Sequence, residues 1–452
     1  MKLDRREILQ LVAGAGMSSF LPALARAQGV GGTGGYRAIV NLFLYGGNDS
    51  NNMIIPTDER YTQYANLRGS LVAVNQADLS PLSGTAYGLH PSLSPLRDIW
   101  DEGALNWVFN SGPLLQPLTR QLYESRPDLR PANLFSHDGQ QNLWQTGGTT
   151  VELPTGWLGR TGDTLIDSGH QAASISLAGT QRAMIGERNM PMLLSNANLS
   201  LSGQDPTSTD PDDIARRAAF QAMLNATQAS TLGEISAELM RGDIAAGAEL
   251  DVILNSEQSA VDAAFVDPQG VAVTGSLADQ LKRIARLIEG RGTLNASRQS
   301  FIAATGGFDN HGSQLGTHAG LLANVGRCVY AFYNTLKVLG VANEIALFTM
   351  SDFNRAFRGN GSAGTDHAWG AHHFVVGGGL KPRQLLGNFP QLALGGPDDA
   401  SDSGRWIPGT SVEEYGGSLV RWLGISDADM PYVFPNWSTW NGGGRGPVDL
   451  FA

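Results

Sequence analysis

The chain has 452 residues, a formal net charge of −11 and 57 glycines, with 42% hydrophobic and 16% charged residues. This length allows one large α/β domain with insertions or two domains, and the low charged fraction excludes a long coiled coil or a highly charged disordered chain. The negative charge disfavours nucleic acid and anionic lipid as partners, because both select basic surfaces.

The first 27 residues are typical of an export signal. The basic pair Arg5–Arg6 precedes an apolar stretch that ends at Leu24, and the small-residue cleavage motif Ala25-Arg26-Ala27 follows. Adjacent arginines resemble a twin-arginine signal, so the twin-arginine translocon is the expected partner during export. The apolar stretch is too short and too glycine-rich for a stable membrane span. We expect a periplasmic or secreted mature protein over residues 28–452; the alternative is a cytosolic protein with an apolar N-terminus.

The apolar pattern predicts an α/β fold with a doubly wound, mostly parallel sheet and helices on both faces. Residues 36–45 form a nearly continuous apolar run, as a strand buried on both faces does. Further strands are predicted at 104–110, 173–179, 299–305, 344–349 and 373–380, and helices at 89–100, 137–146, 276–290, 318–339 and 411–423. Strands that alternate with helices and carry acids at their ends indicate such a sheet.

Two further segments have their own predictions. Residues 181–273 carry helical spacing behind an acidic N-terminal cluster, which predicts a mainly helical insertion that caps the core or shapes substrate access. Residues 156–160, with the sequence GWLGR, are predicted to form a compact turn. The single cysteine, Cys328, excludes an intrachain disulfide and is interpreted as a small core residue.

Asp49 follows the first predicted strand, directly after a glycine pair. Gly46 and Gly47 allow the backbone to turn tightly and to approach a ligand closely. Ligands of open α/β sheets lie beyond the carboxyl ends of the strands. We therefore expect Asp49 to bind a metal; the alternative is an Asx-turn or a helix N-cap.

The stretch from 301 to 373 holds five of the eight histidines, and its acids and imidazoles follow the ends of predicted strands. Carboxylate oxygen and neutral imidazole nitrogen suit Zn, Mn or Mg, so we predict a site for one or two divalent ions. The predicted ligands are Asp49, Asp309, His311, Asp352, Asp366 and His367. His372 and His373 begin a strand, and we do not expect both to be ligands.

Three residues are candidates for catalysis. Ser136 stands at the start of the helix predicted at 137–146, where the free N–H groups favour a nucleophile or an anion; the alternative is an ordinary N-cap. His137 is a candidate base or ligand, or simply a loop residue. Arg355 follows Asp352 closely and would either neutralise an anionic substrate or form a structural salt bridge.

An ordered series of motifs covers nearly the whole mature chain: GGND at 46–49, LHP at 89–91, SHDGQQNLWQTG at 136–147, GWLGR at 156–160, FDNHG at 308–312, SDFNR at 351–355 and GTDHAWG at 364–370. The series resembles the bacterial domain-of-unknown-function family 1501, which is usually exported by the twin-arginine route. That family is grouped with the alkaline-phosphatase-like superfamily of phosphatases, sulfatases and phosphomutases. The resemblance implies an alkaline-phosphatase-like fold.

The resemblance also implies roles for individual residues. Asp49 falls at the first-strand metal aspartate and Ser136 near the nucleophile, while Asp309 and His311 fall at the later Asp/His pair. Asp352 falls at the acid after the next strand, and His367 at the last metal histidine.

Two features depart from the phosphatase and sulfatase pattern. Phe353 stands where those relatives usually carry a histidine after the aspartate, so one metal ligand is lost unless His137 or Asp366 replaces it. The spacing of Asp309 and His311 is also tighter than usual. We expect an exported metal-dependent hydrolase of phosphate or sulfate esters, acting on a small anionic ester; the alternative is a non-catalytic envelope protein that binds or has a structural role and retains the fold.

Overall fold

The computed structural model describes residues 35–150, 152–194, 208–227 and 230–452. The predicted signal peptide, residues 1–27, lies outside these ranges. In the described ranges, no helix combines the length and the apolar character that crossing a bilayer requires.

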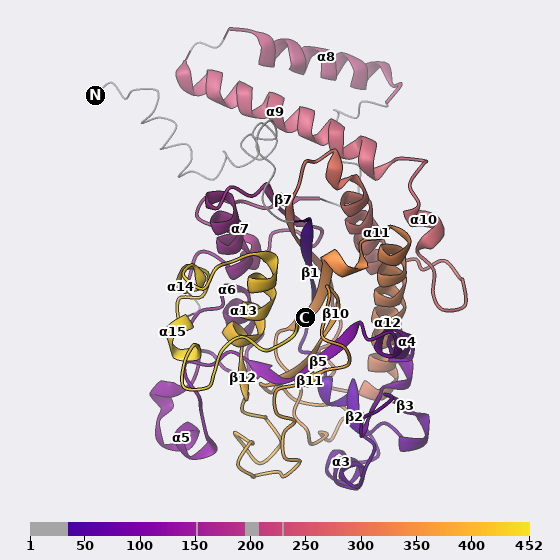
Figure 1. The fold of residues 1–452 in the computed structure, drawn as a ribbon, viewed down its shortest axis with the longest axis vertical. Helices are drawn as coiled ribbons and strands as arrows, with labels where there is room; N and C mark the ends of the chain where they lie inside the picture. Colours follow the sequence, from indigo (N-terminus) through magenta and orange to yellow (C-terminus); the bar gives the residue numbers. More distant parts are fainter. Residues whose placement is uncertain (1–34, 151, 195–207, 228–229) are drawn as a thin grey trace.

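A single large sheet runs through the middle of the protein (Figure 1). Its strands lie in the order β11 (Leu385–Leu386), β5 (Leu105–Gly112), β10 (Ala371–Gly377), β9 (Ile345–Ser351), β1 (Arg37–Leu44), β8 (Arg298–Thr305), β6 (Ala172–Ser176) and β7 (Met192–Leu193), and β12 (Thr410–Ser411) also pairs with β5. All pairs are parallel except those of β10, which runs antiparallel to β5 and β9. The predicted α/β fold with a mostly parallel sheet is confirmed.

Helices cover both faces of this sheet. One face packs against α4 (Pro95–Asp101), α11 (Ser276–Glu289) and α12 (Gln314–Val338), and the other against α6 (His137–Thr146), α7 (Trp157–Asp167), α13 (Val412–Leu423) and α14 (Met430–Val433) (Figure 1). Alternate residues of β1 serve the two cores: Val40 and Leu42 pack on the first face, Ile39 and Phe43 on the second. This two-sided burial is why the strand reads as one apolar run.

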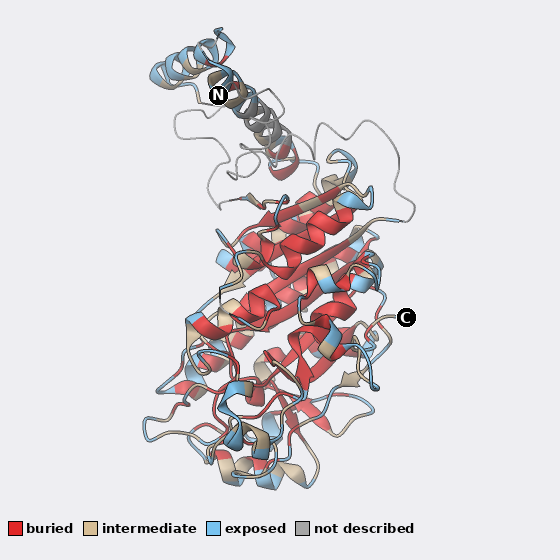
Figure 2. Cartoon of the chain, turned by 90° about the vertical axis from the view of Figure 1, so that its left-hand side faces the viewer, coloured by how far each residue is buried: buried red, intermediate tan, exposed pale blue. Residues whose placement is uncertain are grey.

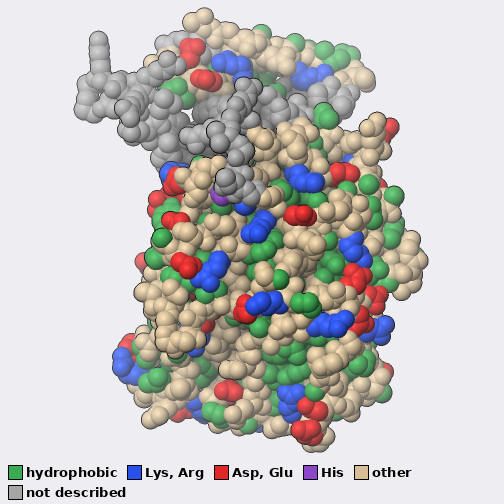
Figure 3. Space-filling view, viewed as in Figure 1, with side chains coloured by type: hydrophobic (Ala, Val, Ile, Leu, Met, Phe, Trp, Pro, Cys, Tyr) green, Lys and Arg blue, Asp and Glu red, His purple; other side chains and the backbone are tan. Residues whose placement is uncertain are grey.

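Smaller elements surround the lower part of the sheet in Figure 1. A three-stranded sheet pairs β2 (Ile54–Pro56), β4 (Tyr87–Leu89) and β3 (Ser80–Pro81), and the remaining helices there are α3 (Arg60–Arg68), α5 (Arg120–Ser125) and α15 (Trp437–Trp440). Figure 2 shows that burial concentrates in the sheet and its flanking helices. Acidic and basic side chains are interspersed over the face seen in Figure 3, as on an ordinary solvent-facing surface.

The segment predicted as an insertion has two parts. Its first part contains β7, which pairs with β6 and extends the sheet. Its later part holds α8 (Pro211–Asn225), α9 (Thr231–Leu254) and α10 (Val261–Ala264), and the α8–α9 pair projects beyond the end of the sheet (Figures 1 and 2). The acidic cluster predicted at the start of this segment stabilises the N-terminus of α8. The side chain of Asp210 caps the helix by accepting a hydrogen bond from the N–H of Asp212.

The prediction of a compact turn at 156–160 is wrong, because this segment begins helix α7. A Cβ atom on Gly156 would lie 2.2 Å from the carbonyl oxygen of Arg182, and one on Gly159 would lie 2.1 Å from the carbonyl carbon of Ile185. The glycines therefore serve close packing of a helix against a neighbouring segment, rather than a change of chain direction.

The functional edge of the sheet is set by three adjacent parallel strands. Leu44 at the end of β1 is in register with Thr305 of β8 and with Ser351 of β9. The segments that follow these strands therefore begin side by side, as expected for ligand sites of open α/β sheets. Gly46 and Gly47 have φ angles of 111° and 76°, and a Cβ on Gly46 would lie 2.6 Å from the backbone nitrogen of Asp309.

Four histidines are buried in the core away from solvent: His90, His318, His372 and His373. Burial lowers the pKa of each to about 3, because a charged imidazole loses its hydration there. In the unfolded chain each returns to the ordinary value near 6.5. Between these values the unfolded chain binds protons that the folded chain does not.

We predict that the free energy of unfolding is highest above about pH 6.5 and falls as the pH is lowered towards 4. Each of these imidazoles contributes a slope of about 1.4 kcal/mol per pH unit. Urea unfolding at several pH values measures the slope. The double variant His372→Asn, His373→Asn should show a slope shallower by about two protons, because asparagine does not titrate; an unchanged slope would contradict the assignment.

Candidate metal centre

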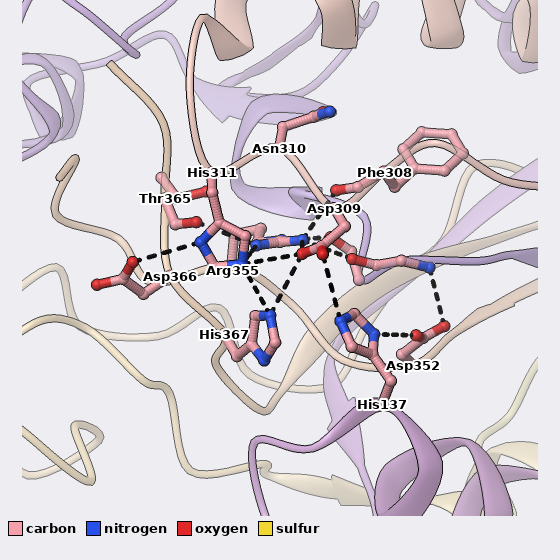
Figure 4. A network of polar contacts seen from close by, with 12 residues as sticks. His137, Phe308, Asp309, Asn310, His311, Asp352, Arg355, Thr365, Asp366 and His367 are labelled. Carbon is pink, nitrogen blue, oxygen red and sulfur yellow. Dashed lines mark hydrogen bonds and ion pairs between the residues drawn. The ribbon is translucent and has the colours of Figure 1, made fainter. Parts of the chain in front are cut away.

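Three imidazoles point their Nε2 atoms at the carboxylate of Asp309 (Figure 4). Nε2 of His311 lies 3.0 Å and Nε2 of His367 lies 3.2 Å from Oδ1 of Asp309, and the two nitrogens are 3.0 Å apart. Nε2 of His137 lies 3.6 Å from the other oxygen, Oδ2. Ligand atoms of His137, Asp309 and His367 all lie within 4.8 Å of one another.

These four side chains come from separate parts of the chain. Asp309 and His311 lie in the loop between β8 and α12, and His137 is the first residue of α6. His367 lies between β9 and β10, where it forms an isolated β-bridge with Arg355. The sheet edge and one helix start thus position the whole cluster.

Hydrogen bonds fix the orientation of two of the rings. Nδ1 of His137 lies 2.6 Å from Oδ2 of Asp352, and Nδ1 of His367 lies 2.8 Å from the backbone oxygen of Phe135. A carbonyl or an ionised carboxylate only accepts, so we assign the proton of each neutral ring to Nδ1. Each Nε2 then carries a free lone pair, which is the form that binds a metal.

The third ring, His311, is oriented more loosely. Its Nδ1 lies 3.6 Å from Oδ1 of Asp366, an exposed carboxylate that also accepts a bond of 3.3 Å from Asn360. Asp366, predicted as a ligand, therefore lies behind the ring of His311 rather than beside its Nε2 atom.

Asp352, also predicted as a ligand, has a supporting position. It is fully buried, and its oxygens accept bonds from His137, from Nε2 of Gln141 at 2.8 Å and from the N–H of Gly46 at 3.1 Å. Its contact with Nδ1 fixes the direction of the His137 ring. Sequence reasoning missed Gln141, although its place one helical turn after His137 puts both side chains on one face of α6.

Arg355 holds the loops of the site together. It is fully buried, and its guanidinium donates to the carboxylate of Asp309. It also donates to backbone oxygens of Gly47 at 2.8 Å, Thr365 at 3.0 Å, Gly46 at 2.6 Å and Phe308 at 3.1 Å. Of the two predicted roles, the structural salt bridge accounts for its contact with Asp309, and its remaining N–H group faces Nε2 of His311 at 3.5 Å.

The charges of the cluster suit a cation at neutral pH. Burial raises the pKa of Asp309, but the bond and charge of Arg355 and the nearby imidazoles outweigh it, so the pKa lies below its ordinary value. Burial lowers the pKa of His367, and the charge of Arg355 lowers it further, while the bond to Phe135 opposes both. Asp309 is therefore ionised and His367 is neutral.

The prediction that Asp49 is a metal ligand is not supported by its surroundings. Asp49 is 2% exposed, and its carboxylate pairs with the buried guanidinium of Arg68. It also accepts bonds from Gln314 and, at 3.2 Å, from Asn51. The physical reason is that Arg68 is itself buried and needs a counter-ion, which takes the oxygens that a metal would require.

Ser136 is the N-cap of α6, where its Oγ accepts a bond of 3.1 Å from the N–H of Gly139. It lies next to His137 in the chain, but the described contacts do not join its hydroxyl to the cluster. Phe353 replaces the missing histidine with an apolar wall, since its ring lies 4.8 Å from that of His137 and 4.5 Å from that of His367. His372 and His373 are both buried against other rings, outside the cluster.

The donor set fits one divalent ion. Ligand atoms around a tetrahedral ion with bonds of about 2.0–2.2 Å lie roughly 3.3–3.6 Å apart. Nε2 of His137 lies 3.6 Å from Oδ2 of Asp309, and the donors of His137, Asp309 and His367 all lie within 4.8 Å of one another. Imidazole nitrogens favour Zn or Mn over Mg, which prefers oxygen. Arg355 already holds Oδ1 of Asp309, so Oδ2 is the oxygen left for an ion.

Comparisons with known proteins give weak structural likeness and one family match. A protein in the alkaline phosphatase superfamily from Vibrio parahaemolyticus has 12% identity and a TM-score of 0.31, covering 85% of this chain and 72% of that one. The lipoteichoic acid synthase LtaP from Listeria monocytogenes has 8% identity and a TM-score of 0.33, covering 83% and 74%. Similarity at this level supports no argument about activity, and a search of curated proteins finds no match. The family described as "Protein of unknown function (DUF1501)" matches residues 36–400, and the chain belongs to that family.

Proposed function

We propose that the protein is a metal-dependent hydrolase of phosphate or sulfate esters. The observation that carries the proposal is the convergence of three Nε2 atoms, from His137, His311 and His367, on the carboxylate of Asp309. A divalent ion held by His137, Asp309 and His367 would keep a coordination position open and would act there as a Lewis acid on an ester oxygen.

The surrounding residues have positioning roles in this proposal. Asp352, which accepts a bond from Gln141, holds the ring of His137, and the backbone oxygen of Phe135 holds that of His367. Such outer contacts fix both the tautomer and the direction of a metal-binding imidazole. Arg355 keeps Asp309 in place and ionised.

Ser136 is the proposed nucleophile. Its hydroxyl sits at the N-terminus of α6, beside the first-turn N–H groups, whose partial positive charge stabilises an alkoxide. Acting as cap uses an oxygen lone pair and leaves the hydroxyl proton free to be removed.

A non-catalytic binding protein is the second candidate, and one observation favours it. The buried charge of Arg355 on Oδ1 of Asp309 and the pairing of Asp49 with Arg68 leave donors for one ion only. A two-ion clamp of attacking and leaving oxygens therefore has no second set of ligands in this cluster. Turnover of aryl phosphates and aryl sulfates by metal-loaded protein separates the two candidates.

We predict about one equivalent of tightly bound Zn or Mn per chain. His367→Ala should lose stoichiometric metal, and Asp352→Asn should weaken metal affinity about 10- to 100-fold, because it releases the ring of His137. Elemental analysis and competition with a chelator measure both effects. His170→Ala removes a histidine outside the cluster and is the matched control; a His367→Ala variant that keeps its metal would overturn the site.

The two roles of Ser136 are separable by substitution. Ser136→Asn keeps a side-chain oxygen for the cap but removes the hydroxyl, whereas Ser136→Ala removes both and costs about 1 kcal/mol of stability. We predict that both variants lose aryl-ester turnover, and that only Ser136→Ala unfolds at lower denaturant. Wild-type turnover by Ser136→Asn would reduce Ser136 to a cap.

We also propose that the chain is exported through the twin-arginine route, on the basis of Arg5 and Arg6. Replacing both with lysine keeps the charge but removes the arginine pair. The variant should accumulate in the cytoplasm with its N-terminal segment uncleaved, as read by fractionation and N-terminal sequencing. Unimpaired export of the variant would contradict this route.

A further inference from the structure

One guanidinium beside the metal centre lacks a protein partner. Within the described part of the chain, the side chain of Arg405 makes no ion pair and no hydrogen bond, and its Nε atom is buried without an acceptor. Its side chain stacks on Phe135, with the guanidinium carbon 4.4 Å from the ring centre. The terminal nitrogens are not buried in this way, so their N–H groups are the donors that oxygens of a ligand can reach.

Arg405 stacks on a residue that is itself part of the centre. The backbone oxygen of Phe135 orients His367, and Ser136 and His137 follow Phe135 directly in the chain. The loop that carries Arg405 also contacts the segments on either side of His367. Phe357 donates its N–H to Gly404 at 3.1 Å, and Gly370 donates to Trp406 at 2.9 Å.

Hydrogen bonds to Asp399 hold the backbone at Arg405, whereas the guanidinium makes no hydrogen bond to the described residues. Asp399 is fully buried, and its carboxylate accepts backbone N–H bonds from Gly404 and Arg405, each at 2.9 Å. It also accepts the N–H groups of Gly395 at 3.0 Å and Ser401 at 2.9 Å. The aromatic face of Phe135 restricts the side chain further, so little conformational entropy is lost when a ligand binds.

Arg355 and Arg405 differ in how many of their N–H groups are hydrogen-bonded to the protein. Arg355 directs its N–H groups at backbone oxygens and Asp309, as Figure 4 shows, whereas Arg405 directs none at a protein acceptor in the described ranges. A planar guanidinium with free donors matches two oxygens of a phosphoryl or sulfuryl group.

We infer that Arg405 recognises the anionic oxygens of the substrate at the metal centre. The inference rests on the proposed function, and it assigns the substrate as an ester that keeps a negative charge. Arg405 is a specificity-determining residue in this assignment, while His137, Asp309 and His367 would hold the ion that polarises the ester oxygen. A neutral ester would leave the guanidinium unpaired and would be disfavoured.

The test measures binding of inorganic phosphate and of inorganic sulfate to zinc-loaded protein by calorimetry, together with steady-state turnover of an aryl phosphate and an aryl sulfate. Arg405→Gln should weaken anion binding and raise KM by about 10- to 100-fold, as loss of a hydrogen bond to a charged group does. Its zinc content should not change. Arg405→Lys should recover part of the anion affinity, because the charge remains and the planar fork is lost.

Arg358→Gln is the matched control, because Arg358 is exposed and lines a separate pocket with residues of α3. It should bind both anions and turn over both esters as the wild type does. Wild-type anion binding by Arg405→Gln would overturn the inference even if the enzyme is active. If the wild type binds neither anion and turns over neither ester, the proposed function fails and the inference fails with it. If anions bind in an Arg405-dependent way but neither ester is hydrolysed, the inference about Arg405 is supported and only the proposed hydrolase activity is contradicted.

Discussion

The buried guanidinium of Arg355 is the contact on which the centre depends. Its donors reach the loop after β1, the loop after β8 and the segment between β9 and β10. A buried guanidinium is costly unless every N–H group finds an acceptor, so the three segments satisfy it only when they are correctly packed together. Because Asp309 is one of these acceptors, the same contact fixes the carboxylate at which the imidazoles meet.

The charge of Arg355 also prepares the cluster for a cation. It keeps the pKa of Asp309 below its ordinary value and helps to lower that of His367. An ionised Asp309 beside a neutral His367 is the protonation state that a divalent ion needs. The same guanidinium occupies Oδ1 of Asp309, so the proposed centre has donors for one ion rather than for a two-ion clamp.

Much of the architecture could be predicted from the sequence, because buried parallel strands read as apolar runs and their carboxyl ends share one edge. That reasoning predicts that Asp309, His311 and His367 lie together at this edge. His137 is singled out because it lies at the start of a predicted helix. The antiparallel direction of β10 could not be predicted, because an apolar run reads the same in either direction. The pairing of Asp49 with Arg68 could not be predicted either, because two glycines with positive φ change the direction of the chain between β1 and Asp49. Arg405 lies outside every local motif, and it is identified by the lack of a hydrogen-bond partner for its side chain among the described residues.

Diffraction from a crystal grown with zinc or manganese, measured at the absorption edge of the metal, tests the central claim most directly. The account predicts one anomalous peak about 2.0–2.2 Å from Nε2 of His137, Nε2 of His367 and a carboxylate oxygen of Asp309. Absence of a peak there in metal-loaded protein, or a peak at Asp49 instead, would contradict it.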